Sequence, residues 1–147
     1  MRRNRRNHCD CMSHIPISHC VCGICVVEEG SEDIEEGIED IEKGLDEIFK
    51  GSFRKGVKYI EEGLLDIIEG EKDLIVGIEA IDCRLTCKKE RECREGICAI
   101  EKGIRDCEEG LREICKGRIC EGADLIEEGL DDIEEGLEDA LKAIEFK

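Results

Sequence analysis

The spacing of glycine constrains the fold of this chain more than any other feature. Fifteen of its 16 glycines form two series, and within each series successive glycines are seven residues apart except for one step of five. The series that runs from Gly30 to Gly77 recurs 66 residues later, from Gly96 onward, with Ala143 in place of the last glycine. Residues 30–81 and 96–147 are therefore a tandem duplication.

The seven-residue spacing coincides with an aliphatic heptad. With glycine at position g, positions a and d are almost all Ile or Leu, as in Ile34, Ile38, Ile41 and Leu45. Most other positions hold Glu, Asp or Lys. Apolar residues spaced three and four apart between charged residues indicate amphipathic helices rather than strands. The sequence therefore predicts an all-α protein.

The five-residue steps interrupt this pattern. Five residues turn a helix by about 500° and seven by about 700°, so the apolar stripe would swing by about 160° at each step. Segments 51–56 and 117–122 begin and end with glycine, which commonly follows a helix C-terminus. We expect two tandem αα-hairpins that form a four-helix, coiled-coil-like rod, and a continuous helix that switches faces is the alternative. The expected helices lie near residues 31–50, 57–82, 97–116 and 123–146.

The chain divides into four parts by composition. A basic Cys/His-rich head (residues 1–29) of irregular structure precedes the first hairpin (30–81), and a Cys-rich charged connector (82–95) leads to the second (96–147). Residues 1–25 carry four Arg and one Asp, a net charge of +3, which leaves −20 for the rest of a chain whose total is −17.

Glycine at each g position requires an explanation. Glycine costs about 1 kcal/mol relative to alanine in a helix interior, so ten copies forfeit about 10 kcal/mol, as much as the net stability of a domain. We expect a missing side chain at g to let the neighbouring helix approach closely. Simple expansion of the repeat unit is the alternative.

Twelve cysteines suggest a role beyond packing. Cys107 replaces an expected d-position Ile and is expected in the core, whereas the others are candidates for disulfides within or between chains. In an up-and-down arrangement the head and the connector share one end of the rod, which gathers nine of them there. Reduced thiols without a role are a further alternative. The disulfide candidates are Cys9, Cys11, Cys20, Cys22, Cys25, Cys83, Cys87, Cys93, Cys98, Cys115 and Cys120.

The head also carries metal-ligand spacing. Cys11 and His14, and again Cys22 and Cys25, are separated by two residues, the gap that lets neighbouring ligands reach one tetrahedral ion. Binding of zinc or copper by these four residues is the alternative function; otherwise no cofactor is expected.

Several classes of function are disfavoured. The acidic body argues against nucleic-acid binding, and no apolar run approaches the roughly 20 residues of a membrane span. The head lacks the apolar core and cleavage site of an export signal. A catalytic cysteine needs a base held beside it, but all three His lie in the head, so we do not expect an enzyme.

The Cys/His-rich head and glycine heptads such as GIEDIEKGLDEI and GICAIEKGIRDCEEGLREICKG resemble the cysteine-rich, low-complexity proteins of bacterial spore coats and exosporia. That resemblance implies a structural protein that assembles with itself into a disulfide-locked layer or filament. Such proteins are made in the mother cell without an export signal and meet oxygen after lysis. The implied location is the spore surface or the extracellular side, and the cytoplasm is the alternative.

Overall fold

The computed structural model describes the backbone of residues 18–81 and 85–145, and the side chains from residue 23 onward within these ranges. The described residues form four helices and no strand. The helices are α1 (Ser18–Phe49), α2 (Phe53–Ala80), α3 (Cys87–Cys115) and α4 (Ile119–Ala143). The two expected hairpins are present: α1 packs closely on α2, and α3 packs closely on α4.

Each hairpin turns on a single glycine. Gly51 and Gly117 adopt positive φ angles of 102° and 97°, a conformation that costs glycine little. The amide N–H groups of Gly51 and Ser52 donate to the carbonyls of Ile48 and Glu47, and the second turn repeats this pair of hydrogen bonds. This is the Schellman arrangement, which satisfies the last carbonyls of a helix. The turns are therefore tighter than the expected five-residue segments, because Gly56 and Gly122 already belong to the next helix.

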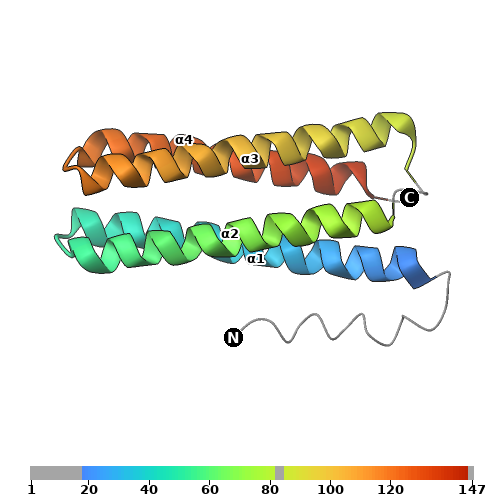
Figure 1. Cartoon of the computed structure of the whole chain (residues 1–147), viewed down its shortest axis with the longest axis horizontal. Coiled ribbons are helices and arrows are strands. Elements are labelled where there is room, and N and C mark those ends of the chain that lie inside the picture. Colours follow the sequence, from blue (N-terminus) through green and yellow to red (C-terminus); the bar gives the residue numbers. More distant parts are fainter. Residues whose placement is uncertain (1–17, 82–84, 146–147) are drawn as a thin grey trace.

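The four helices run up and down along one rod (Figure 1). Both glycine turns lie at one end, called the turn end below, and the starts of α1 and α3 and the ends of α2 and α4 lie at the other, called the connector end. Thirty-two residues of α1 correspond to about 48 Å at 1.5 Å per residue.

A seam of facing glycines holds each hairpin together. A Cβ atom built on Gly37 would lie 2.5 Å from the carbonyl oxygen of Gly63 and 2.6 Å from Cγ1 of Ile67. The seam glycines face one another in seven pairs, and in each pair the built Cβ meets the backbone of the opposite helix. The expectation of close packing is therefore confirmed. The pairs are 23/77, 30/70, 37/63, 44/56, 96/136, 103/129 and 110/122.

Heptad positions d and a pack in different interfaces: position d lies in the seam inside each hairpin, and position a lies between the two hairpins. Position d residues such as Ile41 and Ile67 lie against the facing glycines and are fully buried. Position a residues such as Ile38 and Leu137 line the space between the hairpins. Each hairpin therefore has a tight glycine seam, and a looser aliphatic layer joins the two hairpins.

All four helices begin earlier than expected, and the difference is largest for α1 and α3. Helix α1 starts at Ser18, so residues 18–29 of the expected head continue the first helix. Gly23, the glycine left out of the heptad series, lies seven residues before Gly30 and faces Gly77. Helix α3 starts at Cys87 within the expected connector, because the hydroxyl of Thr86 accepts a hydrogen bond from the Lys89 amide and caps the helix.

Candidate functional site

Exposed thiols lie toward both ends of the rod. Cys87 and Cys98 occupy the first half of α3 and are exposed, and Cys25, near the start of α1, is half-buried. Cys115 and Cys120 flank the turn between α3 and α4 and are both exposed. Cys87 and Cys115 are 28 residues apart on one helix, or about 42 Å along its axis.

Two cysteines point into the protein. Cys107 was expected in the core, and it is fully buried, with its thiol donating to the carbonyl of Ile126 at 3.7 Å. Burial and nearby carboxylates, Asp106 foremost, raise the pKa of Cys107 to about 12. Cys93 was expected in the connector as a cross-linking candidate, but it is 2% exposed and its thiol donates to the carbonyl of Ala140. Its burial argues against a role in links between subunits.

The candidate metal ligands fall mostly outside the described residues. Cys11 and His14 lie outside them, as do Cys9 and Cys83. Cys20 and Cys22 belong to α1, but their side chains are not described. Within the described part of the chain, no group of three or more His, Cys, Asp or Glu side chains is placed to hold a metal ion.

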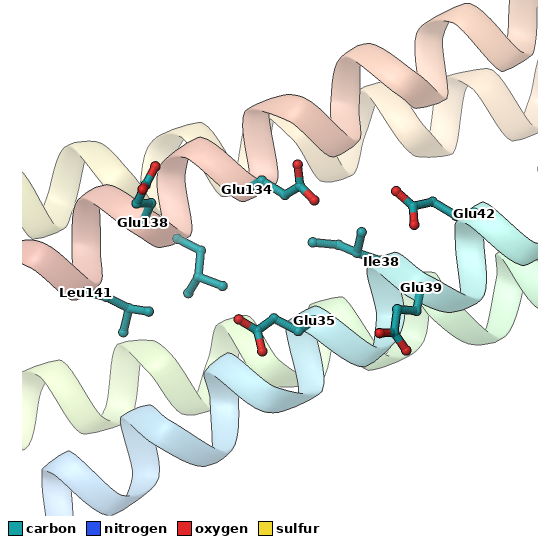
Figure 2. Close-up of a pocket in the computed structure, with 8 residues that line it drawn as sticks. Glu35, Ile38, Glu39, Glu42, Glu134, Glu138 and Leu141 are labelled. Carbon is teal, nitrogen blue, oxygen red and sulfur yellow. The ribbon is translucent and has the colours of Figure 1, made fainter.

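A groove follows the line between α1 and α4. Figure 2 shows its middle, where Ile38 points from α1 toward α4 and glutamates stand on both sides. Here the groove measures 580 Å³, and hollows of 880 and 520 Å³ extend it toward the connector end and the turn end. It stays open because α1 and α4 barely touch, whereas α2 and α3 are in closer contact.

The groove combines an apolar floor with acidic walls. Buried aliphatic residues, including Ile38, Leu137 and Leu130, form the floor. Aspartate and glutamate form both walls, and among the residues that the structure describes, those lining the three hollows include no Lys or Arg. Partial burial, then the nearby carboxylates of Glu42 and Asp131, raise the pKa of Glu134. The walls therefore repel each other and favour a cationic occupant.

A second acidic contact lies between α2 and α3. Glu71 occupies a position a, where the second copy has Leu137, and it is 8% exposed. Its carboxyl group shares a hydrogen bond with that of Glu101 on α3. Burial, followed by this hydrogen bond and the charge of Glu101, raises the pKa of Glu71 to about 7, against a smaller opposing effect of Lys72.

The sequence contains a signal for the Glu71 contact. Aligning the two copies sets Glu71 opposite Leu137, so that a buried acidic residue stands where the second copy has an aliphatic one. An acidic residue in place of an aliphatic one at a position a marks the place where the layer between the hairpins becomes polar. The groove has no such signal, because its walls look like ordinary solvent-facing helix positions.

None of the described helices combines the length and hydropathy that crossing a bilayer would require. Comparison with known proteins found no matching family model, no matching curated protein and no matching solved structure. The function is therefore inferred from the geometry of the chain itself.

Proposed function

We propose that this protein is a structural subunit that assembles with itself and is cross-linked by disulfides into a layer or filament. The observation that carries the proposal is the presence of exposed thiols toward both ends of a rod, with Cys87 at the connector end and Cys115 and Cys120 at the turn end. A subunit with reactive groups at both ends can be linked to two neighbours, which is the minimum for a polymer.

The shape and rigidity of the rod also support this role. Backbones in contact along each seam leave the helices of a hairpin little freedom to slide or bend. Each cross-link forms one S–S bond as two thiols release two protons and two electrons, which molecular oxygen accepts. The resemblance to spore coat and exosporium proteins supplies a setting, because oxygen reaches such a layer after lysis of the mother cell.

Oxidation followed by electrophoresis tests the proposal. Under air oxidation the chain should give a ladder of covalent multimers on non-reducing gels, and a reductant should collapse the ladder to monomer. Changing Cys115→Ser together with Cys120→Ser removes the two exposed thiols at the turn end, so the ladder should shorten to the multimers that can be joined through the connector end alone.

The matched control is Cys93→Ala, which removes one thiol that is buried and should leave the ladder unchanged. A ladder that keeps its length in the turn-end variant contradicts linkage through both ends. Intact mass and metal analysis of the same sample test the alternative function, metal binding by the head. A chain that stays monomeric under oxidation and carries stoichiometric zinc or copper would contradict assembly and favour metal binding.

A further inference from the structure

We propose that the groove between α1 and α4 is the docking site for the arginine-rich segment of this chain itself, residues 1–7. This segment contains Arg2, Arg3, Arg5 and Arg6 and no acidic residue. The docking is non-covalent, and it goes beyond the disulfide-linked assembly proposed above.

The chemistry of arginine fits both parts of the groove. Its aliphatic stem packs on apolar surface while its guanidinium reaches outward to bind carboxylates in a bidentate manner. In the middle of the groove Ile38 and Leu137 supply the apolar surface, and the exposed carboxylates of Glu35, Glu42 and Glu138 stand beside it.

Charge selects this segment over the other available occupant, a second folded copy. With −20 on the chain after residue 25, two bodies repel each other, and contact between two acidic grooves would add to the repulsion. Residues 1–7 carry four positive charges, the most concentrated basic stretch in the sequence.

The length of chain before α1 permits the contact. Seventeen residues precede Ser18, where α1 begins, and an extended chain of that length spans about 55 Å. This span exceeds the roughly 48 Å of α1. The segment can therefore reach the middle of the groove in its own molecule or in a neighbour.

A peptide of residues 1–8 tests the proposal, because it contains all four arginines and no cysteine. Its binding is measured by fluorescence anisotropy to the full-length chain carrying Arg→Gln changes at positions 2, 3, 5 and 6. Binding should weaken as salt rises from 50 to 500 mM. The wild-type chain should bind the peptide more weakly than the Gln variant, because its own arginine segment competes for the groove.

Two matched sets of Glu→Gln changes locate the site. Neutralising Glu35, Glu39, Glu134 and Glu138 in the groove should weaken binding about tenfold, which corresponds to four modest ion pairs. Neutralising four exposed glutamates outside the groove changes the net charge equally and should have little effect. The control positions are Glu61, Glu62, Glu128 and Glu135.

Three results would overturn the proposal. They are equal losses from the two sets of changes, equal affinity of the wild-type and Gln-variant chains, and undiminished binding of a peptide whose arginines are replaced by Gln. The last result would indicate an uncharged apolar occupant. Because the peptide has no thiol, each failure would leave disulfide-linked assembly untouched.

Discussion

Replacing Gly37 with alanine should destabilise the protein, although alanine is the better helix former by about 1 kcal/mol. The added Cβ would lie 2.5 Å from the carbonyl oxygen of Gly63, where ordinary contact starts near 3.4 Å. A backbone carbonyl cannot rotate away as a side chain can, so α1 and α2 must separate locally by about 0.9 Å. That separation also loosens the packing of Ile41 and Ile67, which are fully buried.

The size of the effect follows from these opposing contributions. Overpacking a well-packed interior costs about 1–3 kcal/mol, and the upper end applies because backbone meets backbone. Subtracting the gain in helix propensity leaves a net loss of about 2 kcal/mol, or a fall in Tm of about 4–8 °C for a chain of this size. Thermal and urea unfolding, followed by circular dichroism at 222 nm under reducing conditions, measure it.

Double substitutions sharpen the test. Once Gly37→Ala has separated the helices, Gly63→Ala should cost less than it does alone, whereas Gly103→Ala in the other hairpin should add its full cost. A rise in Tm for Gly37→Ala would refute the reasoning and favour expansion of the repeat.

Three further predictions test other parts of the structure. Because the pKa of Glu71 is raised from 4.5 to about 7, the folded state keeps a proton that the unfolded chain loses in this range. The contribution of protonated Glu71 to the stability of the fold is therefore complete below pH 4.5 and is lost as the pH approaches 7. Relative to Glu71→Gln, the free energy of unfolding from urea titrations should fall by about 3 kcal/mol between pH 4.5 and 7. A difference between the two proteins that stays constant with pH would contradict the contact of buried Glu71 with Glu101. In the native protein, iodoacetamide should modify exposed Cys115 but not buried Cys107, as peptide mass mapping can show, and equal labelling would contradict the packing of α3 on α4. Thr86→Ala removes the cap of α3 and should cost about 1 kcal/mol in urea unfolding, whereas no loss would place the start of α3 elsewhere.

Local periodicity is what the sequence determined. The heptads identify helices because only a helical period brings Ile34, Ile38 and Ile41 onto one side of the chain, and the five-residue steps mark the two turns. The glycine spacing also anticipates close packing, since an isolated helix gains nothing from glycine. Cys107 in the core follows from its place at a position d and is confirmed by its burial.

Tertiary structure decided where the helices end and what lies between the hairpins. Helix α1 extends back to Ser18 because Gly23 completes a pair with Gly77 on α2, a partner 54 residues away in sequence. The burial of Cys93 depends in the same way on the distant α4. The acidic groove exists only because the hairpins meet more closely along α2 and α3 than along α1 and α4. Periodicity within one helix reports which face is buried, but the angle and spacing between two hairpins depend on contacts that no single helix contains.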